Sequence, residues 1–228
     1  MEREVIPAPK IRKIVAKRML ESWQNSPRVS FTMRIDAEKM MDLRKKLNAG
    51  LKEGEGKISY NTIIMKACAI ALMEFPDVNS CFDGENITRN PDANIGLAVD
   101  TEAGLMVPNI KQVQNKTLRQ ISDEMDSAIE RARIGKLKID DMSGGTFTVT
   151  SLGGMGIEHA TPIINPPELA ILGVYTLTDT PVAKDGQVII RPLLTLVLVA
   201  DHRLIDGALA ARFFGRIKEV LETCEGLE

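Results

Sequence analysis

The segment that most constrains the fold is the run at residues 193–200, in which Thr195 alone is polar. A short, continuous apolar run of this kind is typical of a strand that is buried on both faces. The run leads into Asp201-His202-Arg203-Leu204-Ile205-Asp206-Gly207, and residues 208–221 then carry apolar side chains at helical spacing. We therefore expect a buried strand, a tight turn that presents His202 and Asp206, and a helix.

His202 is the candidate for acid–base chemistry, because histidine is the side chain best suited to proton transfer near neutral pH. The chain has two histidines, and the other, His159, lies in a glycine-rich region. A histidine at a strand end can also be purely structural. Asp206 can likewise be no more than a helix N-cap, a position at which aspartate is favoured. The residues alone leave both interpretations open.

Composition excludes several classes of function. The 228 residues carry a formal net charge of -2, with one tryptophan and two tyrosines, and without a basic stripe nucleic-acid binding is disfavoured. The three cysteines are scattered, which predicts neither a disulfide framework nor a metal site and fits a reducing compartment. Membrane-length apolar runs and a signal peptide are both absent from the sequence. We expect a soluble cytoplasmic protein without a nucleic-acid or membrane partner.

The patterning of the chain predicts one α+β domain, a mixed sheet with helices packed on it. Helical periodicity covers residues 10–23, 37–47, 63–75, 117–134 and 208–221. Extended patterns cover residues 28–36, 95–99, 105–110, 146–150, 169–174 and 193–200, with hairpins at 78–89 and 182–190. Residues 1–9 are expected to form an extended arm. The sequence contains no internal repeat and no clear linker.

The glycine-rich stretch at residues 152–159 does not match a nucleotide-binding loop. The G-x-G-x-x-G pattern would need a third glycine where His159 stands, and a G-x-x-x-x-G-K-[ST] motif is also missing. These glycines instead predict a tight loop that needs a positive φ or a close approach of two backbones. The sequence also lacks metal-ligand spacings and the G-x-S-x-G motif of serine hydrolases.

Five ordered blocks of the sequence resemble one enzyme family. The blocks are RKIVAKRM at 12–19, IGLAVDT with GL and VP at 95–108, GGTFTVTSLG at 144–153, INPPELAILG at 164–173 and DHRLIDGA at 201–208. Together they resemble the catalytic domain of the dihydrolipoamide acyltransferases, which form the core of 2-oxo acid and acetoin dehydrogenase complexes. The resemblance covers nearly the whole chain in order.

The resemblance implies a two-layer fold like that of chloramphenicol acetyltransferase and a homotrimer with each active site between two subunits. It implies transfer of an acyl group, most simply acetyl, between dihydrolipoamide and coenzyme A. Residues 1–228 would be a single catalytic domain without a lipoyl or peripheral-subunit-binding domain. The lipoyl group would then be carried on a separate domain or chain, and the partners would include the decarboxylase and dihydrolipoamide dehydrogenase components.

The resemblance also assigns roles to individual residues. His202 would be the general base that activates the thiol, and the hydroxyl of Thr150 would stabilise the oxyanion. Asp206 would hold the turn through an ion pair with an arginine of the first helix such as Arg12. The coenzyme A channel would run past Leu172 and Gly173.

Two rival functions remain open at this point: a small-molecule acetyltransferase of the chloramphenicol type, and a non-catalytic structural core of the complex. The presence of His202, Asp206 and Thr150 argues against the second. The C-terminal segment is rich in glutamate where many relatives end in an apolar tip, and burying several carboxylates at an interface is costly. We therefore expect a trimer that does not assemble into a cage by itself.

Overall fold

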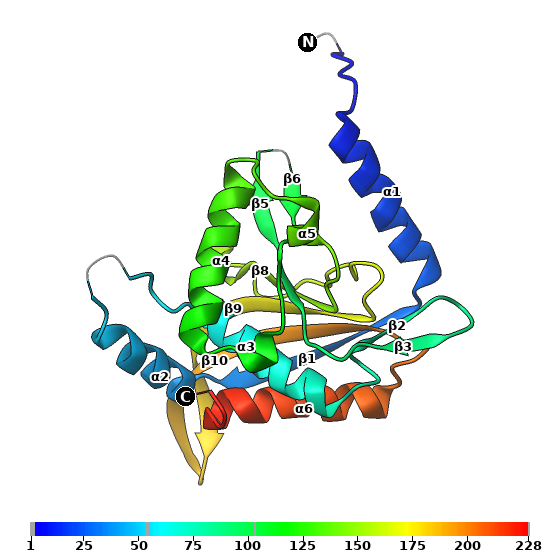
Figure 1. The fold of residues 1–228 in the computed structure, drawn as a ribbon. Helices are drawn as coiled ribbons and strands as arrows, with labels where there is room; N and C mark the ends of the chain where they lie inside the picture. Colours follow the sequence, from blue (N-terminus) through cyan, green and yellow to red (C-terminus); the bar gives the residue numbers. More distant parts are fainter. Residues whose placement is uncertain (1–2, 53–54, 103, 228) are drawn as a thin grey trace.

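The chain folds around a six-stranded mixed sheet with the strand order β1-β10-β9-β8-β4-β7 (Figure 1). The structure is a computed structural model that describes residues 3–52, 55–102 and 104–227. Strand β8 runs parallel to β4 and β9, whereas the other neighbouring strands pair antiparallel. The strands of this sheet are β1 Arg28–Asp36, β4 Ile95–Leu97, β7 Asn109–Ile110, β8 Phe147–Ser151, β9 Ala170–Lys184 and β10 Gln187–Asp201. The expected α+β class is confirmed.

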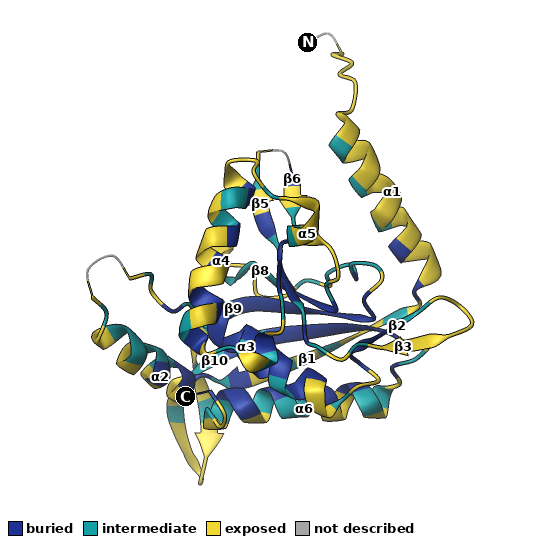
Figure 2. Cartoon of the chain, in the orientation of Figure 1, coloured by how far each residue is buried: buried dark blue, intermediate teal, exposed yellow. Residues whose placement is uncertain are grey.

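One face of the sheet packs against helices and forms the main core (Figure 2). Because side chains alternate along a strand, Leu196, Leu198 and Ala200 of β10 all enter this core. Phe213 is fully buried there, and its ring meets those of Phe75 and Phe147 edge-on at 5.9 Å between centroids. The helices that contribute buried apolar residues are α2 Glu38–Ala49, α3 Tyr60–Glu74, α4 Leu118–Arg133 and α6 Gly207–Thr223.

The opposite face of the sheet is more thinly covered. It carries a small apolar cluster, which consists of Ile164, Ile171, Tyr175, Val197 and Val199. Helix α1 Lys10–Asn25 lies on this side, where the Ser22 hydroxyl donates a 2.6 Å hydrogen bond to the carbonyl of Ile164. Ser22 is the one buried residue of α1, and the helix is otherwise mostly exposed (Figure 2). The exposed residues of α1 include Ile14, Leu20 and Trp23. Leu20 and Trp23, three residues apart, lie on the same side of the helix, and neighbouring exposed apolar side chains of this kind are available to a partner surface.

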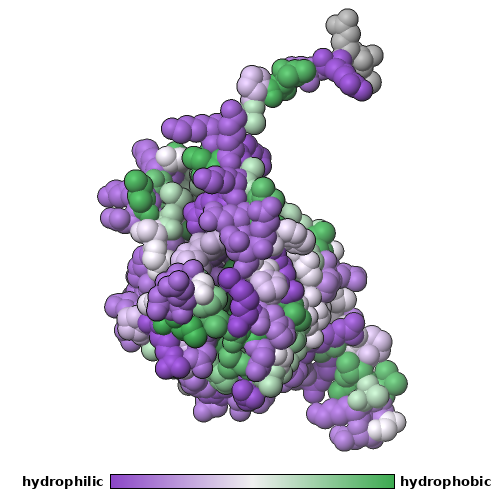
Figure 3. Space-filling model, turned by 90° about the vertical axis from the view of Figure 1, so that its right-hand side faces the viewer, coloured by the Kyte–Doolittle hydropathy of each residue, from purple (hydrophilic) through white to green (hydrophobic). Residues whose placement is uncertain are grey.

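The β9–β10 hairpin is the longest feature of the sheet, paired from its turn to the register pair Ala170↔Ala200. Asp185 and Gly186 both have positive φ, as the two central residues of a type I′ turn require. The sequence predicts this turn correctly but expects much shorter strands. The mostly exposed residues 178–184 of β9 continue the pairing opposite residues 187–193 of β10, so the ribbon extends beyond the neighbouring strands. Figure 3 shows this tip and the N-terminal arm at opposite ends of the molecule.

The predicted strand at residues 95–99 is divided in the structure. β4 ends at Leu97, and β5 Val99–Thr101 pairs instead with β6 Gly104–Met106 in a separate two-stranded sheet. The hairpin expected at 78–89 forms from β2 Ser80–Phe82 and β3 Ile87–Arg89. The short elements α5 Ile139–Met142, η1 Val113–Asn115 and η2 Gly153–Met155 were not expected, because they are too short for helical periodicity to be visible. Within the described ranges, no helix is long and apolar enough to cross a membrane.

Candidate active site

His202 lies in the turn between the end of β10 and the start of α6. Its backbone N–H donates a 2.8 Å hydrogen bond to the carbonyl of Pro27, which joins the turn to the segment between α1 and β1. The residue itself is exposed, so the imidazole can reach a substrate. An exposed imidazole is also open to water, so acid–base chemistry at this position would need a further surface to enclose it.

The turn is held by an ion pair between its neighbours Asp201 and Arg203. The Arg203 Nη2 atom lies 2.7 Å from Asp201 Oδ2, and the Arg203 backbone N–H donates to Asp201 Oδ1 at 3.0 Å. Asp201 is 2% exposed, and its own backbone N–H donates to the carbonyl of Leu169 at 2.8 Å. The side-chain hydrogen bonds to Asp201 raise the pKa of Arg203 above its ordinary value. This pair was not expected from the sequence, although Asp201 directly follows a buried strand and is a usable signal for it.

Asp206 is the N-cap of α6. Its Oδ1 atom accepts a 2.7 Å hydrogen bond from the backbone N–H of Leu209, and the residue is exposed. The first N–H groups of a helix have no partner within the helix, which explains why an aspartate is favoured there. The capping interpretation from the sequence is therefore confirmed.

The expected ion pair between Asp206 and Arg12 is not formed within the chain. Arg12 lies near the start of α1, where its Cζ atom is 3.8 Å from the position that a Cβ at Gly104 would occupy. Figure 1 shows this end of α1 and helix α6 at opposite sides of the molecule. The charges that pair at this turn are Asp201 and Arg203.

Thr150 lies near the end of β8, half-buried, and pairs in parallel register with Gly173 of β9. A Cβ on Gly173 would lie 2.5 Å from the hydroxyl of Tyr175, so the tyrosine ring can cover this position because it is a glycine. Leu172 is fully buried in the main core. Its side chain therefore does not reach a channel, and the expected contact with coenzyme A would have to come from other atoms of this segment.

Thr150 and His202 are not brought together within one chain. Thr150 of β8 pairs with Gly173 of β9, and Gly173 pairs with Val197 of β10. His202 follows Val197 by five residues along the direction of β10. At about 3.3 Å per residue and about 4.8 Å between strands, the two residues of one chain lie roughly 19 Å apart. This distance is far beyond the hydrogen-bond contact with a common substrate atom that general-base and oxyanion roles require.

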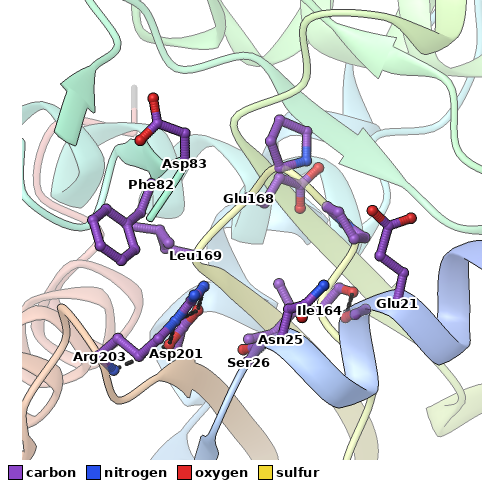
Figure 4. A pocket seen from close by; sticks show the side chains of 13 residues that line it. Glu21, Asn25, Ser26, Phe82, Asp83, Ile164, Glu168, Leu169, Asp201 and Arg203 are labelled. Carbon is purple, nitrogen blue, oxygen red and sulfur yellow. Dashed lines mark hydrogen bonds and ion pairs between the residues drawn. The ribbon is translucent and has the colours of Figure 1, made fainter. Parts of the chain in front are cut away.

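A cavity of about 420 Å³ lies beside the His202 turn (Figure 4). The end of α1, the β2–β3 hairpin, the segment before β9 and the pair Asp201–Arg203 form its walls. A second cavity, of about 470 Å³, lies between α1, the strands β6 and β7, and the segment before β9. Glu168 contributes to both cavities. Burial raises the pKa of Glu168 to about 8, although hydrogen bonds from Thr148 and Asn165 offset part of this effect.

The glycine-rich loop serves packing in this structure, as the sequence predicts. A Cβ on Gly153 would lie 2.2 Å from the carbonyl oxygen of Tyr175, and Gly156 has a φ of +78°. His159 of the same loop stacks on the ring of Tyr175, with 6.2 Å between centroids. In the part of the chain that the structure describes, no cluster of histidine, cysteine, aspartate and glutamate could hold a metal ion.

The capping geometry predicts a modest effect for Asp206→Ala. We expect it to lower the free energy of unfolding by about 1 kcal/mol, the usual cost of removing an N-cap, whereas Asp206→Asn should be close to neutral. Urea denaturation measures both. Asp42→Ala, at an exposed aspartate within α2, is the control and should stay within about 0.5 kcal/mol of the wild type. A loss of about 3–5 kcal/mol for Asp206→Ala would instead indicate a buried ion pair.

Comparison with known proteins identifies a family. The family model "2-oxoacid dehydrogenases acyltransferase (catalytic domain)" matches residues 1–228. The chain is 37% identical over 218 residues to the acetyltransferase component of the acetoin cleaving system of Bacillus subtilis, covering 95% of this chain and 55% of that protein. It is 38% identical over 224 residues to the acetyltransferase component of the pyruvate dehydrogenase complex of Staphylococcus aureus, covering 97% and 52%. The chain therefore spans about half the length of these curated relatives.

Solved structures agree with this assignment. The dihydrolipoamide acetyltransferase of Azotobacter vinelandii superimposes with a TM-score of 0.95 and 38% identity, covering 99% of this chain and 94% of that one. The cubic core of a pyruvate dehydrogenase multienzyme complex matches with a TM-score of 0.94 and 38% identity, covering 99% and 94%. Chloramphenicol acetyltransferase, at 12% identity and a TM-score of 0.59 over 96% and 99%, shares the fold alone. The chain belongs to the 2-oxoacid dehydrogenase acyltransferase family, of which it forms the catalytic domain.

Proposed function

We propose that the chain transfers an acyl group, most simply acetyl, between dihydrolipoamide and coenzyme A. Membership of the family supports this activity, and the position of His202 supports its mechanism. His202 is exposed at the end of a buried strand, in a turn fixed by the Asp201–Arg203 pair. Two of the three residues that carry our assignment, the proposed base His202 and the helix cap Asp206, occupy this one turn. The third, Thr150, lies on β8.

The assignment of these three residues is supported by the spacing of three residues along the chain of the Azotobacter vinelandii enzyme. The study of that structure concerns the catalytic role of one serine, one histidine and one asparagine, with the serine 52 residues before the histidine and the asparagine four after it. In this chain, Thr150 stands 52 residues before His202, and Asp206 stands four after it. Threonine keeps the hydroxyl of serine. Aspartate keeps the capping oxygen of asparagine, which fits its observed hydrogen bond to the Leu209 N–H.

The chemistry follows from the properties of thiols. A thiol is a weak nucleophile until it loses its proton. His202 takes the proton of the coenzyme A thiol as the sulfur attacks the thioester carbon, and the carbonyl oxygen becomes an oxyanion. The Thr150 hydroxyl donates a hydrogen bond to this oxyanion. When the intermediate collapses, the carbon–sulfur bond to dihydrolipoamide breaks, and His202 returns the proton to the departing sulfur. The reverse direction uses the same steps.

The active site in this proposal is formed by two chains. Thr150 and His202 of one chain lie roughly 19 Å apart along the sheet, so a common substrate atom must meet Thr150 of one subunit and His202 of another. The thinly covered sheet face and the exposed apolar side chains of α1 supply a surface for such an interface. A closed ring of three identical subunits satisfies this heterologous contact. Coenzyme A and the lipoyl group would enter the enclosed site as substrates.

The partners are proposed on the same basis. The lipoyl group would arrive on a lipoyl domain, either within a longer chain or on a separate one, and decarboxylase and dihydrolipoamide dehydrogenase components would complete the cycle. A chloramphenicol-type function is less well supported, because the similarity to that enzyme is limited to the fold at 12% identity. A non-catalytic core is also less well supported, because it would not require Thr150, His202 and Asp206 at the spacing found in the Azotobacter vinelandii enzyme.

Replacing the proposed base tests the mechanism. His202→Ala should lower kcat by about 10²–10⁴-fold, the usual contribution of a positioned general base. The melting temperature should change little, since the side chain is exposed. Acyl transfer from acetyl-coenzyme A to dihydrolipoamide measures the rate. His159→Ala removes the other histidine and should leave kcat within a few-fold of the parent. Equal losses in the two variants would remove His202 from the mechanism.

The proposed oxyanion donor is tested by two substitutions at one position. Thr150→Ala should raise the barrier by roughly 2.7–4 kcal/mol, as for the loss of one oxyanion donor. Thr150→Ser retains the hydroxyl and should retain most of kcat. The same transfer assay serves for both. A serine variant as impaired as the alanine variant would assign the role to the methyl group of Thr150.

The size of the assembly is also predicted. Near the C-terminus, Leu227 is 1% exposed and already packs in the core of its own chain. Glu222 pairs with Lys218 at 2.6 Å, and Glu225 lies 3.8 Å from Arg216. This segment therefore presents charges rather than an apolar contact. Light scattering coupled to size-exclusion chromatography should give about three times the 25.1 kDa mass of the chain. A species of about 24 or 60 subunits would contradict this expectation, because those are the sizes of closed cages built from several trimers.

A further inference from the structure

Glu168 is a buried acid to which the proposed chemistry assigns no role. It is 5% exposed, and its Oε1 atom accepts two hydrogen bonds, from the Thr148 hydroxyl at 2.9 Å and from Asn165 Nδ2 at 3.1 Å. Its Oε2 atom is buried and has no hydrogen-bond partner among the described residues. Buried polar atoms are satisfied in the great majority of cases, so an orphaned carboxyl oxygen needs an explanation.

The two hydrogen bonds of Glu168 connect it to the strand that carries Thr150. Thr148 precedes Thr150 by two residues on β8, and residues two apart lie on the same face of a strand. Thr148 pairs with Ile171, and Thr150 with Gly173, so this end of β9 is aligned with β8 directly after Glu168. A displacement of the β8 backbone at Thr148 would therefore also displace Thr150.

Glu168 is also one residue from the contact that holds the His202 turn. The carbonyl of the next residue, Leu169, accepts the backbone N–H of Asp201, and Asp201 in turn pairs with Arg203. Glu168 thus stands where β8, the start of β9 and the end of β10 come together. Figure 4 shows Glu168, Leu169, Asp201 and Arg203 around the same cavity.

The surroundings of Glu168 favour the uncharged acid. Burial raises its pKa to about 8, and its two hydrogen bonds and Arg18 offset this only in part. Arg18 Nη2 already donates to the carbonyl of Pro166 at 2.8 Å, and Arg203 is engaged by Asp201. The other charged groups in the walls of the cavity beside the turn, Glu21 of α1 and Asp83 of the β2–β3 hairpin, are acidic and supply no cation to pair with a carboxylate at this position.

We infer that Glu168, in its protonated form, is a positioning residue that holds the Thr150 strand and the His202 turn in their working arrangement. This inference rests on the proposed function for its kinetic consequence, but the structural role of the neutral acid does not depend on it. Ionisation would place a charge on a buried carboxylate with one oxygen unpartnered. The contact between β8, the start of β9 and the end of β10 would then loosen. We expect kcat to fall without a change in KM.

The test compares the wild type with Glu168→Gln and Thr148→Val across pH. Glutamine has the shape of the neutral acid and cannot ionise. The ratio of kcat in Glu168→Gln to kcat in the wild type should be near one at pH 7 and rise about tenfold by pH 9, because one group with a pKa of about 8 is then mostly ionised. Taking the ratio cancels the titration of the substrate thiols. KM for both substrates should stay within about two-fold.

Thr148→Val removes the hydroxyl at nearly constant volume and is the matched control for the strand contact. It should lower kcat at pH 7 with KM unchanged. At pH 9, Glu168→Gln should raise kcat less in the Thr148→Val background than in the wild type, because both changes act on one contact. A ratio that stays flat from pH 7 to pH 9 would overturn the inference. So would a Glu168→Gln variant that folds but is inactive at pH 7, since the ionised form would then be needed.

A second readout separates this inference from the proposed function. The pKa of Glu168 is raised in the folded state, so the stabilisation from the neutral acid is full below about pH 4.5 and is lost as the pH rises through about 8. The melting temperature of Glu168→Gln, relative to the wild type, should therefore increase from pH 5 to pH 8 and level off above. A constant difference would contradict a protonated Glu168. If the wild type transfers no acyl group while this trend is present, the proposed function fails, but the structural role of the protonated Glu168 stands.

Discussion

The register of three strands controls what this chain can do. Thr150 of β8 pairs with Gly173 of β9, and Gly173 pairs with Val197 of β10, so Thr150 lies two strands away from β10 and opposite a point five residues before His202. These positions are fixed by backbone hydrogen bonds within a buried sheet, and side-chain movement cannot close a gap of roughly 19 Å. A reaction that uses both the Thr150 hydroxyl and the His202 imidazole therefore requires two copies of the chain.

The two faces of the sheet are consistent with this requirement. One face is closed by the chain's own helices, with fully buried residues from α3 and α6. The other carries a small cluster around Tyr175 and leaves large apolar side chains of α1 exposed. The turn at the end of β10 is held by contacts within the chain, because Asp201 pairs with Arg203 and Asp206 caps α6. Each chain thus presents a preformed half of the proposed site, and association brings two halves together.

Local patterns in the sequence were sufficient for the parts of the structure that local physics determines. The apolar run at 193–200, the cap at Asp206 and the Asp-Gly turn at 185–186 were all predictable, because each follows from strand composition, orphan helix N–H groups or left-handed turn geometry. The matching blocks made the family recognisable as well. The ion pair expected for Asp206 was wrong, because an ion pair depends on which charges lie nearby in the fold: Asp206 caps α6, and the paired aspartate of the turn is Asp201. Glu168 was missed because nothing in its sequence context signals burial, which arises from α1 and the segment before β9 closing over it.

The central claim, that each site takes Thr150 from one chain and His202 from another, is tested most directly by mixing two inactive variants. Thr150→Ala and His202→Ala chains would be co-expressed or unfolded together and reassembled, and acyl transfer measured per chain. Random mixing should restore about one quarter of the wild-type rate, because every mixed ring of three rebuilds one intact site. Each variant refolded alone provides the baseline. A mixture that stays at this baseline, although mixed trimers form, would mean that both residues act within one chain or that one of them has no role, and would contradict the account.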